Sequence, residues 1–293
     1  MASAFLTARV VENKQWAENL FSVKLAVKLR PFKAGQFVRV QLMIEGEPMA
    51  KPYSLVNSPN QDIAEVFYNI VPNGPMSNAL AALKPDDTIE ISQPAAGFFV
   101  LNEVPDTPNL WMFATGTGLG PYLSILQDDE AWQRFENLVL IHAVSYADNL
   151  AYQSLIESFN KRLPKKFRYI PIVSREAHSG ALQGRIPALI SDGQLEKAAG
   201  LSIDPEDTHL QQGDLRFEPN SALVAGDQGM ADIRHIVETA LNHMLPGGWL
   251  MIEHGYQQGE RVRSVFVAKG YQQVKTIRDF GGNERVTMGC WGL

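Results

Sequence analysis

Cysteine is nearly absent from this sequence of 293 residues: Cys290 is the single one. One cysteine excludes a disulfide within the chain, an iron–sulfur cluster and any metal site built on several thiolates. Long hydrophobic runs are also absent, since stretches such as residues 111–114 and 170–173 fall far short of the ~20 apolar residues of a membrane helix. The N-terminus has no basic start followed by an apolar segment, as a signal peptide would. We therefore expect no metal, no membrane partner and a cytoplasmic location.

Positive charge is scarce as well. The chain has 26 Lys and Arg residues against 32 Asp and Glu residues, which gives a net charge of -6. A general nucleic-acid-binding protein usually has a basic face, so we expect no nucleic-acid partner. The content of 45% hydrophobic and 20% charged residues is ordinary for a globular protein, and the length suffices for two domains with cores of their own.

The first hundred residues predict a small antiparallel β-barrel. Short stretches rich in Val, Ile, Phe and Tyr are separated by Pro, Gly and Asn, a pattern typical of strands joined by turns. We expect strands at residues 8–11, 20–27, 36–43, 53–56, 64–71 and 88–92, and one helix at residues 76–83.

The pattern changes within residues 97–107, where we place a domain boundary. From there strands alternate with helices, which is the signature of βαβ units and a parallel sheet. We expect strands at residues 110–114, 138–144 and 168–173, and helices at residues 121–127, 150–162 and 186–192. After a polar stretch, the remaining chain predicts strands at residues 222–225, 249–253, 271–278 and 285–289, and helices at residues 231–244 and 260–269.

Two short motifs suit a flavin dinucleotide: Lys51-Pro52-Tyr53-Ser54, and residues 73–77 at the start of a predicted helix. FAD needs an aromatic face for its ring, a donor for the N5 edge, a cation for its pyrophosphate, and helix N-terminal amides for the same phosphates. The candidate FAD-binding residues are Lys51, Tyr53, Ser54, Gly74, Met76 and Ser77. Taken alone, Tyr-Ser in a strand is common, and a purely structural role remains open.

A glycine-rich loop follows the predicted strand 110–114 and precedes a helix. Its residues 114–121 have the sequence Ala-Thr-Gly-Thr-Gly-Leu-Gly-Pro. A loop of this kind lets backbone amides approach a pyrophosphate at the helix N-terminus. A tight turn without a ligand remains the alternative. The candidate cofactor-binding residues are Thr115, Gly116, Thr117, Gly118 and Pro121.

Two arginines, Arg175 and Arg185, come just after the third strand of the predicted parallel sheet. Ligands of such sheets bind at the carboxyl ends of the strands. Two guanidinium groups there suit the 2′-phosphate that distinguishes NADP from NAD. Each arginine alone could equally be an ordinary surface residue.

Together these motifs resemble the bacterial ferredoxin (flavodoxin)–NADP reductases over about residues 1–205. Further matches are at residues 34–37, 52–59, 96–100 and 174–176. The resemblance implies an N-terminal antiparallel FAD-binding barrel, then a parallel α/β nucleotide-binding sheet for NADP(H). It also implies Tyr53 against the flavin ring and Ser54 near N5 as the catalytic residues, with electrons exchanged with a ferredoxin or flavodoxin. Lys51 stands where the family usually has arginine, which keeps the charge but loses the bidentate fork. Ser145 also stands where an arginine is common, so the preference for NADP over NAD stays open.

From about residue 203 the sequence instead resembles the C-terminal part of the release-factor glutamine methyltransferases. The matching motifs are at residues 209–214, 216–219, 247–249, 253–256 and 283–287. Neither the AdoMet-binding glycine loop nor the Asn-Pro-Pro-Tyr motif of that family is present, so we expect no methyl transfer. The chain therefore resembles a chimera, whether natural or an artefact.

Three segments are expected: an FAD-binding barrel (1–102), an NADP-binding α/β domain (103–205) and a methyltransferase-like segment (206–293). We expect residues 222–225 to replace the strand that the reductases have here, residues 246–256 to form the fifth strand of the sheet, and the last two strands to pair at its edge. Glu253 and His254 fit ordinary strand-end residues, and Trp291 fits a packing residue. The leading hypothesis is an NADP-dependent flavin reductase. The alternatives are an FAD-binding but catalytically impaired fusion and, less favoured, a methyltransferase fragment without an AdoMet site.

Overall fold

The computed structural model describes residues 4–203, 208–212, 230–255, 258–278 and 284–292. The chain divides into two compact units, Met1–Phe217 and Glu218–Leu293. Within the described ranges, no helix has both the length and the apolar composition of a membrane span.

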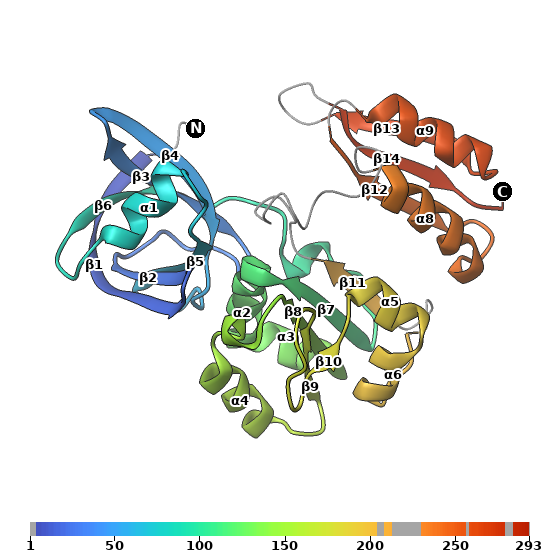
Figure 1. Ribbon diagram of the computed structural model, residues 1–293, viewed down its shortest axis with the longest axis horizontal. Helices are drawn as coiled ribbons and strands as arrows, with labels where there is room; N and C mark the ends of the chain where they lie inside the picture. The colour runs from blue at the N-terminus through green and yellow to red at the C-terminus, as the bar shows by residue number, and fades with distance from the viewer. Residues whose placement is uncertain (1–3, 204–207, 213–229, 256–257, 279–283, 293) are drawn as a thin grey trace. The chain divides into compact units, whose positions relative to one another are not determined.

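The N-terminal part of the first unit is a six-stranded antiparallel sheet in the order β4-β3-β6-β1-β2-β5, with α1 against β3 and β4 (Figure 1). Its core is an aliphatic cluster that includes Val23, Val38, Val66 and Ile91, each at most 1% exposed. The elements are β1 (Ala4–Ala17), β2 (Leu20–Ala26), β3 (Phe37–Ile44), β4 (Glu47–Ser54), β5 (Ile63–Asn69), α1 (Pro75–Ala82) and β6 (Thr88–Gln93). The predicted barrel and its helix are confirmed.

Two strands differ from the sequence prediction: β1 runs from Ala4 to Ala17 rather than over residues 8–11, and β4 is shifted. We expected a strand at residues 53–56, but β4 ends at Ser54 and begins at Glu47. Glu45 and Gly46 both have positive φ, and they join β3 to β4 as a two-residue hairpin loop. Strand pairing therefore starts directly after this loop. The sequence did not predict a strand there because proline, here Pro48, is rare in strands away from sheet edges.

The second part of the first unit is a parallel sheet in the order β10-β9-β8-β7-β11. The residues of β7 and β8 are almost all buried, because α2, α3 and α4 cover one face of the sheet and α5 and α6 the other. The elements are β7 (Asn109–Thr115), α2 (Leu119–Gln127), α3 (Asp129–Arg134), β8 (Asn137–Val144), α4 (Gln153–Arg162), β9 (Phe167–Val173), β10 (Leu182–Gln183), α5 (Ile186–Ser191), α6 (Gln194–Ala199) and β11 (Thr208–Gln212). The parallel sheet is as predicted, while α3, α6, β10 and β11 are additions.

The edge strand β11 was hidden in a stretch that seemed too polar for a strand. It pairs in parallel with β7, from Thr208 opposite Asn109 to Gln212 opposite Phe113. Main-chain hydrogen bonds make this ladder, so it does not need apolar side chains. The predicted strand at residues 222–225 and its turn at residues 226–229 lie outside the described residues.

Side-chain hydrogen bonds tie the barrel to the parallel sheet within the first unit. Ser124 and Gln127 on α2 donate to the carbonyls of Asn57 and Val56, each at 2.7 Å. Gly35 also belongs to this contact: with φ +94, a Cβ there would lie 1.9 Å from the carbonyl oxygen of Phe99. Only glycine allows this approach of two backbones.

The second unit has a sheet and a core of its own. Its three antiparallel strands have the order β12-β14-β13, and α8 and α9 pack together on one face (Figure 1). Apolar residues between sheet and helices, among them Val237, Val262 and Phe266, are fully buried. The elements are α8 (Met230–Ala240), β12 (Trp249–Glu253), α9 (Gly259–Ala268), β13 (Gln272–Arg278) and β14 (Glu284–Cys290).

The expectation that residues 246–256 form the fifth strand of the parallel sheet is wrong. β12 is paired antiparallel with β14, from Trp249 opposite Cys290 to Glu253 opposite Val286. The predicted pairing of the last two strands is confirmed, but in this separate sheet rather than at the edge of the parallel one. The physical reason is that Ile252 and its neighbours find their apolar partners on α8 and α9.

His254 and Trp291 both belong to the packed interior of the second unit. His254 is buried and its Nε2 lies 2.8 Å from the hydroxyl of Thr287. Trp291 packs against Tyr271, with ring centroids 5.9 Å apart. Both are packing and hydrogen-bonding residues of the second unit, as expected.

Candidate functional site

The glycine-rich loop lies at the carboxyl end of β7. Thr115 is the last residue of the strand, residues 116–118 make one turn of 3₁₀ helix, and α2 begins at Leu119. Gly116 has φ +48, and a Cβ on Gly118 would meet nothing within 4 Å, so the loop leaves room beside its backbone. This strand-loop-helix order presents backbone amides at a helix N-terminus. Pro121 is buried in the first turn of α2 and contributes to the helix start.

A buried histidine beneath this loop was missed by the sequence analysis. His142 on β8 has no exposed surface; its Nε2 lies 3.2 Å from the Gly116 carbonyl oxygen, and its Nδ1 3.4 Å from the Tyr169 hydroxyl. Gln153 donates to the same hydroxyl at 3.0 Å. Burial lowers the pKa of His142 to about 4 and raises the pKa of Tyr169 to about 12, so both groups are neutral at pH 7. A histidine inside an otherwise apolar strand is the one signal that could have found it.

The two candidate arginines lie just beyond the carboxyl ends of the parallel strands β9 and β10. Gln183 at the end of β10 is paired with Val173 at the end of β9, and Arg185 and Arg175 each follow two residues later. Both side chains are exposed. The backbone N–H of Arg175 donates to the carbonyl of Ser145 at 3.0 Å, which brings the loop after β8 to the same place.

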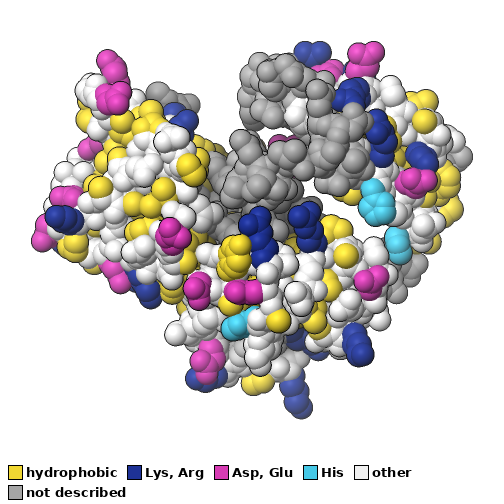
Figure 2. All heavy atoms as spheres, viewed as in Figure 1, with side chains coloured by type: hydrophobic (Ala, Val, Ile, Leu, Met, Phe, Trp, Pro, Cys, Tyr) yellow, Lys and Arg dark blue, Asp and Glu magenta, His cyan; other side chains and the backbone are white. Residues whose placement is uncertain are grey.

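An aromatic residue accompanies this arginine pair. The guanidinium carbon of Arg175 is 5.7 Å from the centroid of the Tyr146 ring, which is 46% exposed. On the face drawn in Figure 2, Lys and Arg side chains are interspersed with Asp and Glu and do not form one large basic patch. Arg175 and Arg185 bring two positive charges to the carboxyl ends of β9 and β10.

The candidate flavin residues of β4 lie on an outer strand of the barrel sheet. Lys51 and Tyr53 share one face of the strand, because side chains alternate along it, and Lys51 is exposed. The half-buried ring of Tyr53 meets Tyr68 edge-on, with centroids 6.1 Å apart. Burial raises the pKa of Tyr53 to about 12, so its hydroxyl stays protonated. Ser54 is the last residue of the strand and pairs with Phe37.

The start of α1 is shaped as the sequence predicts. Asn73 has φ +60, Gly74 is the N-cap and Pro75 is the first helical residue. The Ser77 hydroxyl accepts from the N–H of Val71 at 3.0 Å and donates to the carbonyl of Gly74 at 3.2 Å. The side chains of Met76 and Ser77 are buried, so what this turn offers outward is backbone.

The two candidate sites are connected through a short segment. Residues 55–57 directly follow Ser54, and the carbonyls of Val56 and Asn57 accept the hydrogen bonds from α2, the helix that the glycine loop begins. A Cβ on Gly120 would touch the Val56 side chain at 3.4 Å. Residues 55–57, which follow β4, thus connect the candidate flavin strand to α2, the helix that follows the glycine loop.

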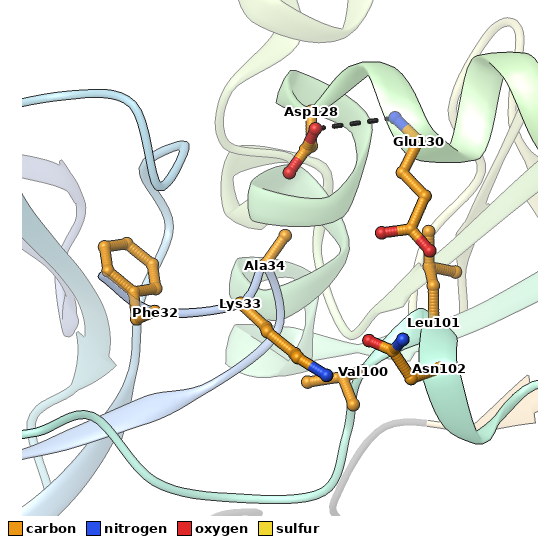
Figure 3. Close-up of a pocket in the computed structure, with 8 residues that line it drawn as sticks. All are labelled: Phe32, Lys33, Ala34, Val100, Leu101, Asn102, Asp128 and Glu130. Carbon is orange, nitrogen blue, oxygen red and sulfur yellow. Dashed lines mark hydrogen bonds between the residues drawn. The ribbon is translucent and has the colours of Figure 1, made fainter.

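A pocket elsewhere in the first unit has a different lining (Figure 3). None of the candidate cofactor residues belongs to it. It is lined by Phe32, Lys33, Ala34, Val100, Leu101, Asn102, Asp128 and Glu130. Over the described parts of the chain, no group of three or more His, Cys, Asp and Glu residues is arranged to hold a metal ion.

Two family models match this chain. Residues 7–99 match the oxidoreductase FAD-binding domain, and residues 112–236 match the oxidoreductase NAD-binding domain. The flavodoxin/ferredoxin–NADP reductase of Shigella flexneri is 48% identical over 206 residues, which are 70% of this chain and 83% of that protein. The chain belongs to the flavodoxin/ferredoxin–NADP reductase family.

A solved reductase has the same fold as the first unit. The ferredoxin NADP+ reductase from Neisseria gonorrhoeae, determined with bound FAD and NADP, is 32% identical with a TM-score of 0.65, over 70% of this chain and 83% of that one. The predictions of an oxidoreductase and of FAD and NADP(H) as its cofactors are therefore confirmed.

The rest of this reductase-family chain has a different relative. The release factor glutamine methyltransferase of Escherichia coli is 61% identical over 87 residues, which are 30% of this chain and 31% of that protein. The chimera inferred from the sequence is confirmed.

Proposed function

We propose that this reductase-family chain passes electrons between NADP(H) and a ferredoxin or flavodoxin through FAD bound in its barrel. One observation carries the proposal: the glycine loop and the two arginines lie at one sheet edge, and α2 ties that loop to the segment after Ser54. A pyridine nucleotide and a flavin held by these groups would be neighbours. We also propose the division into residues 1–102, 103–205 and 206–293.

The residues present fit FAD. Tyr53 offers an aromatic face on an outer strand, Lys51 an exposed cation on the same strand face, and the start of α1 offers backbone amides without an intrahelical acceptor. Ser54, at the end of the same strand, offers a hydroxyl. FAD, when bound, supplies the chemistry that takes up two electrons together and gives them away singly. The protein's own task is to orient the ring and shield it from water.

The residues at the sheet edge fit NADP(H). Residues 115–118 offer backbone amides, and Arg175 and Arg185 offer two exposed guanidinium groups for the 2′-phosphate. Ser145 adds no charge there, so the preference for NADP over NAD rests on two arginines.

The test is a titration of the purified chain. We expect a flavin absorption spectrum, and bleaching of that spectrum by NADPH under anaerobic conditions. Oxidised ferredoxin or flavodoxin added afterwards is expected to restore the flavin colour. A colourless protein that takes up no FAD would refute the proposal.

A second candidate, an FAD-binding but impaired fusion, is favoured by one observation: β12 belongs to the separate sheet of the second unit and does not supply a strand to the parallel sheet. Catalysis needs the reacting atoms within about 3–3.5 Å, and small misplacements are costly. The two candidates differ in the rate of flavin reduction, which is slow in the impaired fusion although both cofactors bind.

A further inference from the structure

The row of hydrogen bonds beneath the glycine loop has one possible direction. The carbonyl oxygen of Gly116 can only accept, so the Nε2 of His142 carries the proton. The unprotonated Nδ1 then accepts from the hydroxyl of Tyr169, whose oxygen accepts from the side-chain amide of Gln153. Every member of the row has a partner, and the imidazole is fixed in one tautomer.

The direction of the Gly116 carbonyl determines the direction of the next amide. The C=O of Gly116 and the N–H of Thr117 belong to one planar trans peptide and point in opposite directions. Because the carbonyl points inward to His142, the N–H of Thr117 points away from it. The backbone N–H of Leu119 donates to the same carbonyl within the 3₁₀ turn, so His142 supplies a second donor, from a side chain, that holds this peptide in its direction.

We propose that His142 is a positioning residue of the NADP site, which holds the peptide between Gly116 and Thr117 so that the Thr117 N–H faces the coenzyme's pyrophosphate. This inference rests on the proposed function. An apolar side chain could fill the same volume, but it would remove the buried side-chain donor, and the N–H of Leu119 alone would then hold the Gly116 carbonyl in this direction.

The test uses the full chain and two ligands. NADP+ has a pyrophosphate, whereas adenosine 2′-monophosphate has only the phosphate expected at Arg175 and Arg185. Calorimetry gives the dissociation constant of each ligand for three variants. His142→Leu removes the donor, His142→Gln keeps an N–H near the position of Nε2, and Tyr169→Phe removes the hydroxyl that donates to Nδ1.

For His142→Leu we expect about tenfold weaker binding of NADP+, which corresponds to ~1.4 kcal/mol, and unchanged binding of adenosine 2′-monophosphate. His142→Gln should restore most of the NADP+ affinity, and Tyr169→Phe should weaken it by a smaller factor. Nitrogen NMR of the wild-type imidazole should show the proton on Nε2. FAD content and melting temperature serve as controls for folding.

Equal weakening of both ligands, unchanged NADP+ binding by a folded His142→Leu, or a proton on Nδ1 would each overturn the inference while the proposed function stands. If His142→Leu does not fold, Tyr169→Phe and the NMR tautomer decide in the same way. If the wild-type chain binds neither ligand, the proposed function and this inference both fail.

Discussion

The hydroxyl of Tyr152 donates a 2.8 Å hydrogen bond to Oε1 of Glu65, across the contact between the parallel sheet and the barrel. Both residues are buried, and the Tyr152 ring also lies 4.4 Å from the ring of Trp16, centroid to centroid. Tyr152 has φ +58, which is rare for a bulky residue and begins α4 later than the sequence predicts. The Tyr152–Glu65 hydrogen bond thus joins the barrel to the parallel-sheet part of the first unit.

Tyr152→Phe should destabilise the first unit, because the buried carboxyl group of Glu65 loses one of its donors. The expected loss in free energy of unfolding is about 1–3 kcal/mol, measured by urea denaturation. Tyr146→Phe is the matched control, since Tyr146 is 46% exposed and its loss of a hydroxyl should change the stability little. Equal stability of the two variants would mean that water replaces the missing hydroxyl at Glu65.

The stability of the first unit should depend on the protonation of Glu65. The pKa of Glu65 is raised above its ordinary value of 4.5, and burial is the largest cause of this shift. Hydrogen bonding from Tyr152 and the charge of Lys24 oppose the shift. The folded state therefore binds this proton more tightly than the unfolded state. The stabilisation is fully present below pH 4.5 and is lost as pH rises through the folded pKa. The free energy of unfolding, plotted against pH across this range, should have different slopes for the wild type and for Glu65→Gln. Equal slopes would contradict the assignment.

Tyr53→Ala should weaken the retention of FAD. The variant loses an aromatic contact of about 1 kcal/mol in addition to buried area. Flavin content after dialysis measures the effect, and Tyr146→Ala, at the NADP edge, is the control that should keep its flavin. If Tyr53→Ala retains FAD as tightly as the wild type, the flavin ring lies elsewhere.

Replacement of both Arg175 and Arg185 by Ala should raise the KM for NADPH far more than that for NADH. Each charge-assisted hydrogen bond to the 2′-phosphate contributes roughly 1.5–3 kcal/mol. Lys161→Ala, an exposed cation paired with Glu157 on α4, should leave both KM values unchanged. Equal losses for the two coenzymes would remove these arginines from the phosphate site.

A chain that ends after Phe217 should still bind FAD and NADP+, because every candidate residue lies in the first unit. Truncation after residue 256 is less informative, since it removes β14, the central strand of the second sheet, and would unfold the second unit. Anaerobic stopped-flow reduction by NADPH compares the shortened and full chains. Faster reduction after truncation would show that the second unit obstructs catalysis, and loss of folding would show that it supports the first unit.

Much of the architecture followed from local patterns. Stretches rich in Val, Ile, Phe and Tyr between Pro, Gly and Asn predicted the barrel strands, and Asn73 and Pro75 marked the start of α1. Strand β11 was missed because parallel pairing uses main-chain atoms and leaves little trace in polar side chains. The partnership of β12 with β14 was missed because it depends on which apolar face packs against α8 and α9, a tertiary choice.

The candidate site divides in the same way. The glycine loop and the arginines have recognisable sequence contexts, whereas His142 acts on Gly116 from a neighbouring strand. Nothing in the order of residues along the chain places Tyr152 beside Glu65, because 87 positions separate them. Long-range side-chain partners of this kind depend on the tertiary fold.

Strand β11 has a consequence for how such a chimera can arise. It belongs to the stretch that resembles the methyltransferases, yet it completes a ladder with β7 of the reductase part. A ladder built from peptide groups accepts foreign residues in a way that a core built from fitted side chains does not. Recombination that joins two genes at this edge therefore meets a permissive position, where the incoming chain has only to be extended.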